Sequence, residues 1–457
     1  LIEAVRNGEV TEELIDKKVA NILRVMFKTK MIGDKRDERK AGTFNSPEHR
    51  AAALSVAEES IVLLKNEKNI LPLNKQEVKS IAVLGANADM SHSSGGGPAE
   101  IKALYEIAPL IGLKMYLGGN TKVTYNKGYY VATKALNATE NWQATSLETG
   151  SDEMSEYPYL KLQKPGQYAK ENETLFKEAL EAAKDADKVI FFGGLDHNYD
   201  IEGADRPDMK LPYDQDIIIE KLLDVRPDTI IVLNGGSPVE MPWLDKADTL
   251  IYNYYAGMEN GTALAKVIFG DVNPSGKLSE SFPYKYSDTV TYKNGEFSKD
   301  DCIEYKEGVF YGYRYYEKEG IDVAFPFGYG KSYTTFEYSD LTIKEVCTNA
   351  CEKEGCDSAL SVSLNVKNTG EVDGKEVVEI YVGENNPTVL RPVKELKGFE
   401  KVELKAGESK TVTVTIPKSR LGYYDDNIGA FVTNNGEYTV YACASSKDIR
   451  LKALVTL

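Results

Sequence analysis

Between residues 46 and 270, helical segments alternate with short strands that are apolar for most of their length. The predicted strands are Ser80–Leu84, Lys188–Phe192, Asp228–Leu233 and Thr249–Tyr254. The predicted helices around them are Pro47–Leu63, Glu173–Ala186, Gln215–Val225 and Gly261–Phe269. Strands joined through helices of about ten residues or more pair in parallel, and strands without a polar face are buried on both sides. The pattern therefore predicts an α/β domain with a mainly parallel sheet, covered by helices on both faces.

Beyond Phe336 the hydrophobic pattern changes to a period of two residues. Turns rich in Gly and Asn separate the alternating segments, which begin at Ser361, Val377, Thr411 and Tyr438. Such alternation is typical of strands with one buried face, and several short strands in succession indicate a sandwich. We expect an all-β domain here, a β-sandwich of about seven strands with immunoglobulin-like architecture.

These patterns divide the 457 residues into four parts. Residues 1–45 hold two amphipathic helices and a polar linker, and residues 46–285 form the α/β domain, with an irregular insertion near 127–165. Residues 286–335 lie in a stretch rich in Pro, Gly and Tyr and are expected to form an extended wrap. Residues 336–457 form the sandwich. At roughly 100 to 200 residues per domain, a chain of this length has room for two or three domains.

The charge of the chain argues against two classes of partner. With a net charge of −16 and no basic stripe, neither nucleic acid nor an anionic membrane surface is expected to bind. The longest apolar runs are also far shorter than the roughly 20 residues that cross a bilayer. We therefore expect a soluble protein with no nucleic-acid partner and no membrane partner.

The cysteines and the glycosylation sequons favour a secretory route. Three of the five cysteines lie close together, as in one or two disulfides of an oxidising compartment, at Cys347, Cys351 and Cys356. A zinc site is the alternative, but none of the three histidines lies beside this cluster, so no metal is expected. Acceptor sequons, which also arise by chance, begin at Asn137, Asn172 and Asn260.

One acidic loop, Gly193–Gln215, follows the apolar strand that ends at Phe192. It combines Arg206 with a crowd of carboxylates, namely Asp196, Asp200, Glu202, Asp205, Asp208 and Asp214. Like charges packed at the end of a rigid strand can raise the pKa of one carboxyl into the range of a general acid. The alternative, which composition alone favours, is a solvated acidic loop.

A second loop, residues 87–99, follows strand Ser80–Leu84 and contains Gly95, Gly96 and Gly97. Ligands of α/β sheets bind beyond the carboxyl ends of the strands, where both of these loops fall. The glycine loop has neither the G-x-G-x-x-G pattern nor the G-K-[ST] ending of phosphate-binding loops. We therefore expect no nucleotide and no other cofactor.

Long motifs from both predicted domains occur together and in a fixed order. They are Ser60–Asn66, Tyr254–Gly261, Ile268–Pro283, Gly308–Tyr316, Phe325–Tyr338, Val366–Gly370 and Leu396–Phe399. Through them, nearly the whole chain resembles glycoside hydrolase family 3. The resemblance implies an exo-acting β-glucosidase or β-xylosidase. It also implies an N-terminal β/α barrel, an α/β sandwich domain and a fibronectin type III-like domain.

The resemblance places this chain after the barrel, which the chain itself lacks. Residues 1–30 resemble the helices that leave the barrel, so we expect the C-terminal portion of the enzyme. The family retains anomeric configuration with two carboxylates about 5 to 5.5 Å apart, a nucleophilic Asp on the barrel and an acid/base Glu. No stretch of this chain matches the nucleophile motif. The barrel, on a separate chain or a removed segment, is thus an implied partner, and this chain alone is expected to be inactive.

Within the acidic loop, the resemblance assigns the acid/base role to Glu202, with Asp200 as the competing candidate. Asp205 and Arg206 are expected to form an ion pair that shapes the loop. His197 is expected either to pack within the loop or to bind sugar. The glycine loop is expected to lie close to the sugar site.

The implied substrate is a β-linked oligosaccharide, with β-glucosides favoured. Preference between glucosides and xylosides stays open, as does a homodimer. The alternative function, from another class, is a non-catalytic carbohydrate-binding or adhesion module derived from such an enzyme. We expect the protein to be secreted.

Overall fold

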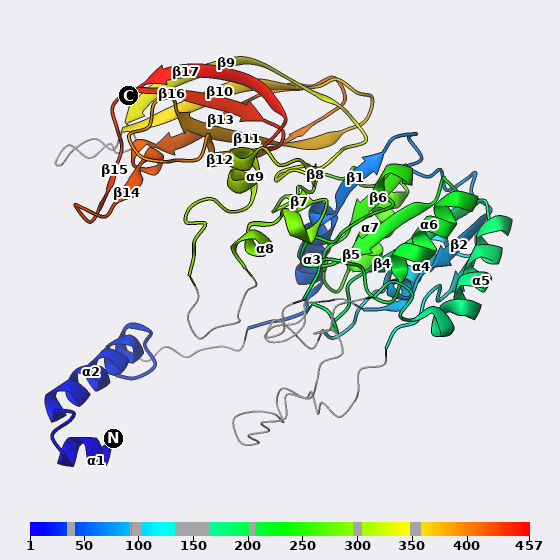
Figure 1. Cartoon of the computed structure of the whole chain (residues 1–457), viewed down its shortest axis with the longest axis horizontal. Helices are drawn as coiled ribbons and strands as arrows, with labels where there is room; N and C mark the ends of the chain where they lie inside the picture. Colours follow the sequence, from blue (N-terminus) through cyan, green and yellow to red (C-terminus); the bar gives the residue numbers. More distant parts are fainter. Residues whose placement is uncertain are drawn as a thin grey trace. The chain divides into compact units, whose positions relative to one another are not determined.

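The structure is a computed structural model and is shown in Figure 1. It describes residues 1–33, 42–91, 93, 103–132, 164–200, 206–295, 304–347 and 358–457. Its contacts divide the chain into two units, Leu1–His49 and Arg50–Leu457.

The first unit contains the two expected helices, α1 (Ile2–Arg6) and α2 (Glu12–Lys28). Thr11 caps α2, because its side-chain oxygen accepts a hydrogen bond from the backbone N–H of Leu14 at 3.2 Å. Neither helix buries a residue, so the apolar face of α2 is exposed.

The α/β domain is built on one six-stranded sheet with the order β1-β6-β5-β4-β2-β3. Its strands are β1 (Val62–Asn66), β2 (Ser80–Leu84), β3 (Lys122–Asn126), β4 (Lys188–Gly194), β5 (Ile230–Asn234) and β6 (Thr249–Tyr252). Five of these strands are parallel, and β1 pairs antiparallel with β6 at one edge. The predicted, mainly parallel sheet is therefore confirmed.

Helices cover both faces of this sheet (Figure 1). They are α3 (Pro47–Ser60), α4 (Pro109–Leu117), α5 (Ala169–Asp185), α6 (Gln215–Val225) and α7 (Asn260–Ile268). Alternate residues of β4 face the two cores, since Phe191 packs with α5 and α6, and Phe192 packs with α4 and α7. Short 3₁₀ helices are η1 (Ala86–Asp89) and η4 (Leu244–Lys246).

Two details differ from the predicted elements. The helix predicted to reach Leu63 ends at Ser60, and the apolar residues after it form β1. A short apolar run fits a helix or a strand equally well, so the boundary could not be read from periodicity. The second difference is the pair α4 and β3, which the sequence pattern did not reveal.

A segment with little regular structure links the sheet to the sandwich. Its described elements are β7 (Phe282–Pro283), η5 (Tyr286–Asp288), α8 (Val290–Asn294), α9 (Tyr313–Glu319) and β8 (Val323–Phe325). β7 pairs antiparallel with β8, so the two ends of this segment lie together.

The C-terminal domain is the expected β-sandwich. One sheet contains β9 (Phe336–Cys347), β10 (Ser358–Asn368) and β13 (Ser409–Pro417). The other contains β11 (Gly374–Glu384), β12 (Glu395–Leu404), β16 (Glu437–Cys443) and β17 (Ile449–Thr456). The hairpin β14 (Tyr423–Asp425) and β15 (Ala430–Val432) and the 3₁₀ helix η6 (Lys418–Leu421) complete it. Seven strands in two sheets confirm the predicted architecture.

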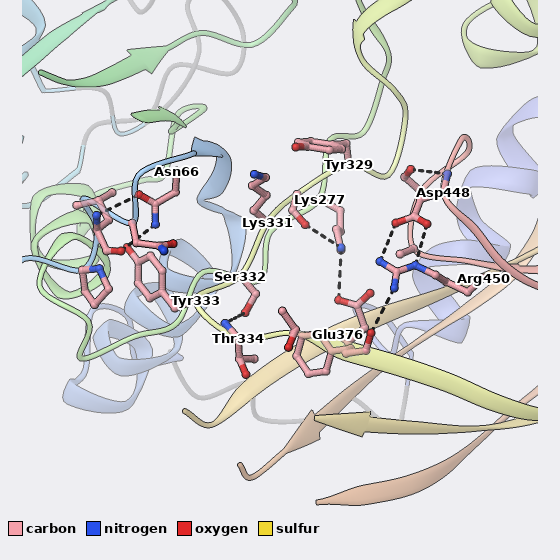
Figure 2. A pocket seen from close by; sticks show the side chains of 18 residues that line it. Asn66, Lys277, Tyr329, Lys331, Ser332, Tyr333, Thr334, Glu376, Asp448 and Arg450 are labelled. Carbon is pink, nitrogen blue, oxygen red and sulfur yellow. Dashed lines mark hydrogen bonds and ion pairs between the residues drawn. The ribbon is translucent and has the colours of Figure 1, made fainter. Parts of the chain in front are cut away.

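A pocket lies where the sandwich meets the chain that follows α7 (Figure 2). The Nζ of Lys277 donates a hydrogen bond to the carbonyl of Gly330 at 3.0 Å and lies 3.5 Å from the Oε2 of Glu376 on β11. Arg450 pairs with Asp448 at 2.8 Å and lies beside Glu376 in the same pocket. Charged groups from both domains therefore meet at this junction.

The structure bears on the cysteines and sequons. Cys347 is disulfide-bonded, and Cys443 is a buried free thiol. Asn172 and Asn260 are buried and bonded to other side chains or to the backbone, which leaves no room for a glycan. Asn137 lies outside the described residues. In the part of the chain that the structure describes, no helix is long and apolar enough to span a membrane.

Candidate active-site edge of the sheet

The carboxyl ends of β4 and β5 approach each other more closely than side chains would allow. Gly194 ends β4 with a φ of 114°, and a Cβ there would lie 2.0 Å from the carbonyl oxygen of Asn234. The backbone N–H of Leu195 donates to that same oxygen at 2.8 Å. The loops after the two strands therefore start side by side.

Asp196 fixes the beginning of the acidic loop. Its carboxylate is buried and accepts hydrogen bonds from the hydroxyl of Tyr213 and from the backbone N–H of Asn198, both at 2.9 Å. Burial raises the pKa of Asp196, and these hydrogen bonds oppose the rise. Because Tyr213 lies at the far end of the loop, this carboxylate ties the two ends of the loop together.

Asp200 holds the acidic loop against the loop that follows β5. Its Oδ2 accepts a hydrogen bond from the backbone N–H of Gly236 at 2.6 Å. Tyr255, which follows β6, lies next to it: burial, and then the charge of Asp200, raise the pKa of the Tyr255 hydroxyl. The carboxylate of Asp200 is therefore engaged by groups from two neighbouring strand ends.

His197 packs edge-on against the ring of Tyr255, with ring centroids 6.0 Å apart. This contact is to a residue outside the acidic loop, and it places the imidazole at the same strand ends. Packing within the loop and sugar binding both stay predictions for His197.

Arg206 binds the same loop as Asp200. Its Nη2 donates to the side-chain oxygen of Ser237 and to the carbonyl of Pro238, both at 2.9 Å. Glu280 lies close by: burial raises its pKa to about 7, Arg206 opposes the rise and Asp200 adds to it. Two carboxyls and one guanidinium thus meet at the carboxyl edge of the sheet.

Several predicted site residues lie outside the described ranges: Glu202, Asp205, Gly95, Gly96 and Gly97. The expected ion pair of Asp205 with Arg206 and the place of the glycine loop therefore stay predictions. No group of three or more potential metal ligands occurs among the residues that the structure describes.

The structure adds partners that sequence reasoning missed. Gly236, Ser237, Tyr255 and Glu280 surround Asp200 and Arg206. The first three follow shortly after predicted parallel strands, whose carboxyl ends lie at one edge, so the sequence could place them at this edge but could not place them against Asp200 and Arg206. Nothing local marks Glu280.

Two family models match the chain in the order of its domains. Residues 61–333 match the glycosyl hydrolase family 3 C-terminal domain, and residues 376–446 match the fibronectin type III-like domain. The chain belongs to glycoside hydrolase family 3. The family 3 match contains the whole sheet together with Asp200, Arg206, Gly236 and Glu280. The resemblance seen in the motifs is thereby confirmed.

Known beta-glucosidases match this chain over nearly its whole length. The thermostable beta-glucosidase B of Acetivibrio thermocellus is 37% identical over 462 residues, which cover 100% of this chain and 54% of that protein. A beta-glucosidase of Bacteroides ovatus is 38% identical over 460 residues, covering 98% of this chain and 56% of the relative. The chain thus spans about half the length of these curated relatives.

The fold matches solved structures of beta-glucosidases. The beta-glucosidase from Kluyveromyces marxianus in complex with glucose superposes with a TM-score of 0.82 at 29% identity, covering 100% of this chain and 68% of that one. The beta-glucosidase of Bifidobacterium adolescentis gives a TM-score of 0.80 at 31% identity, with 100% and 60% covered. The two-domain arrangement of this chain therefore recurs within longer proteins.

Proposed function

We propose that this chain is the C-terminal part of a retaining β-glucosidase that supplies the general acid/base, Glu202, to a nucleophile on an N-terminal β/α barrel. One observation carries the proposal: beta-glucosidases match the chain over its whole length at 37% and 38% identity. The relatives are longer than this chain, which is consistent with a barrel as its partner. The chain alone should then lack activity.

The surroundings of Asp200 support Glu202 as the acid/base. Asp200 already accepts a hydrogen bond from the backbone N–H of Gly236, and Tyr255 lies against it. A general acid must instead be free to protonate the glycosidic oxygen and later to deprotonate water. Asp200 is therefore the weaker candidate, although both residues belong to the same short loop.

The proposal predicts a chemical signature for Glu202. In the enzyme that combines this chain with its barrel, Glu202→Ala should lower the rate of hydrolysis of alkyl β-glucosides by a factor on the order of 10² to 10⁴. Added azide should restore turnover of dinitrophenyl β-glucoside and yield glucosyl azide. Azide attacks the glucosyl-enzyme without a general base, and the dinitrophenolate leaves without a proton.

Two controls sharpen this test. This chain assayed alone should release no phenol from an aryl β-glucoside, and adding the barrel should restore release. Asp224→Asn, which changes an exposed carboxylate on α6, should behave like the wild type. Turnover by this chain alone at the rate of the complete enzyme would refute the proposal.

We also propose that the substrate is a short β-linked glucoside and that the protein is secreted. The disulfide at Cys347 supports an oxidising compartment. Comparing initial rates on aryl β-glucosides and aryl β-xylosides tests the first statement. Finding the protein in the culture medium, with Cys347 oxidised in the intact mass, tests the second.

A further inference from the structure

The residues on either side of segment 201–205 bind one and the same loop. Asp200, just before the segment, accepts a hydrogen bond from the backbone N–H of Gly236 at 2.6 Å. Arg206, just after it, donates to Ser237 and Pro238 at 2.9 Å each. Two anchors of opposite charge therefore hold the chain before and after the segment on residues 236–238.

Burial of the preceding strand and hydrogen bonds to neighbouring residues hold residues 236–238 in place. They follow β5, whose residues are all buried. The hydroxyl of Tyr252 on β6 donates to the carbonyl of Ser237 at 2.7 Å. The backbone N–H of Glu240 donates to the carbonyl of Met209 at 2.7 Å. The part of the acidic loop after Arg206 is therefore also hydrogen-bonded to the chain that follows β5.

The fit around Asp200 is close. A Cβ on Gly236 would lie 2.8 Å from the Oδ2 of Asp200, nearer than ordinary van der Waals contact. The same Cβ would lie 3.5 Å from the ring of Tyr255. A side chain at position 236 would therefore push the carboxylate of Asp200 off its backbone donor.

Arg206 has capacity for a further contact. Its Nη1 is buried and has no hydrogen-bond partner among the described residues. Buried guanidinium N–H groups are nearly always paired, so this nitrogen is a donor that the described contacts leave unused. The loop 236–238 thus holds the guanidinium through Nη2, and Nη1 takes no part in that attachment.

We propose that Asp200 and Arg206 are positioning residues for acid/base catalysis, which fasten the chain before and after Glu202 to the loop 236–238. The inference rests on the proposed function of Glu202. A general acid works only within hydrogen-bonding reach of the oxygen it protonates, and a displacement of about 1 Å can cost on the order of 10²-fold in rate. Neither anchor needs to touch the sugar.

The test uses the enzyme with its barrel and compares leaving groups. Asp200→Ala and Gly236→Ala should each lower kcat/KM for phenyl β-glucoside by about 10- to 100-fold. For dinitrophenyl β-glucoside, which needs no proton, kcat/KM should change by less than about 3-fold. Equal losses on both substrates, or none, would overturn the positioning role.

The conservative variant separates positioning from catalysis. Asp200→Asn keeps an oxygen that can accept from the N–H of Gly236, so it should recover most of the loss caused by Asp200→Ala. If Asp200 were itself the acid/base, Asn would be as inactive as Ala, and azide would rescue Asp200→Ala. That outcome would overturn both the positioning role and the role of Glu202.

The second anchor has its own variant. Ser237→Ala removes one acceptor of Arg206 and should show the same dependence on leaving group, in a milder form, with thermal unfolding like that of the wild type. If azide rescues Glu202→Ala while Asp200→Ala and Ser237→Ala leave both substrates unaffected, the proposed function stands and the positioning role fails. Asp224→Asn is the matched control throughout.

Discussion

The carboxyl of Asp216, in the first turn of α6, lies in an environment that disfavours its ionised form. Its Oδ1 accepts a hydrogen bond from the indole N–H of Trp243 at 2.8 Å. Burial raises the pKa of Asp216 to about 7 against this hydrogen bond, and Glu240 and Glu220 add to the rise. An unfolded aspartate has a pKa of about 3.9, so the folded protein binds this proton more tightly. The resulting stabilisation is complete at low pH and is lost as the pH rises through 7.

We expect Asp216→Asn to remove this pH dependence, because the amide oxygen of Asn can still accept from Trp243. Between about pH 5.5 and pH 8, the free energy of unfolding of the wild type should fall by roughly 2 kcal/mol more than that of the variant. Urea unfolding at the two pH values measures the difference. Asp224→Asn, an exposed change on the same helix, should keep the wild-type dependence. Equal pH dependence in Asp216→Asn and wild type would disprove the assignment.

At the same scale, the site could be predicted only in part. Asp200 and Arg206 stood out because a charged loop follows an apolar strand. Their partners Gly236 and Ser237 did not, because these contacts depend on the strand order β6-β5-β4. Local periodicity predicts that strands exist and leaves their lateral order open.

Among the elements, those with a strong pattern were predictable and those at the sheet edges were not. α6 has a clear helical periodicity and β5 is a fully buried apolar run, and the predicted bounds of both agree within two residues. β3 lies at the edge and exposes three of its five residues, so no apolar run marks it. β1 begins two residues after α3 ends, and its first two residues, Val62 and Leu63, were predicted as the end of that helix.

The crossing of α4 and α7 depends on two glycines that no periodicity reveals. A Cβ on Gly112 would lie 2.1 Å from the carbonyl oxygen of Gly261, so the two helix backbones touch there. We expect Gly112→Ala to push the helices apart and to lower the free energy of unfolding by about 1 to 3 kcal/mol, despite the better helix propensity of Ala. Denaturant unfolding measures this loss.

Gly42→Ala is the matched control for that prediction, because a Cβ on Gly42 meets nothing within 4 Å. Its unfolding should follow the wild type within about 0.5 kcal/mol. A Gly112→Ala variant as stable as the control would mean that the backbones of α4 and α7 do not meet at these glycines.

Across the whole of residues 50–457, the two domains are joined through charged side chains that the sequence could not pair. Lys277 and Glu376 are 99 positions apart, yet both are largely buried at the junction (Figure 2). Each looks like an ordinary surface charge within its own segment. Composition and periodicity could predict two domains, but the docking of one on the other is determined by contacts between distant segments.

A further buried pair, Lys394 with Glu317, joins α9 of the linking segment to the sandwich and provides a test of how this side of the sandwich is held. Both side chains are largely buried, and burial raises the pKa of Glu317 in spite of the neighbouring Lys394. Removing one partner leaves the other charge buried and unpaired, which lowers the free energy of unfolding by about 3 to 5 kcal/mol. We expect Glu317→Gln to lower the free energy of unfolding by roughly this amount in a urea titration.

Glu59 is the matched control, because it also bridges to the sandwich but its ion pairs with Lys375 and Lys401 are about one-third exposed. Water can solvate the lysines that Glu59→Gln leaves behind, so this variant should lose less than about 1 kcal/mol. The double variant Glu317→Leu/Lys394→Met should regain most of the stability lost in Glu317→Gln, since no buried charge is left unpaired. If Glu317→Gln and Glu59→Gln lose equal stability, burial does not govern the strength of this junction.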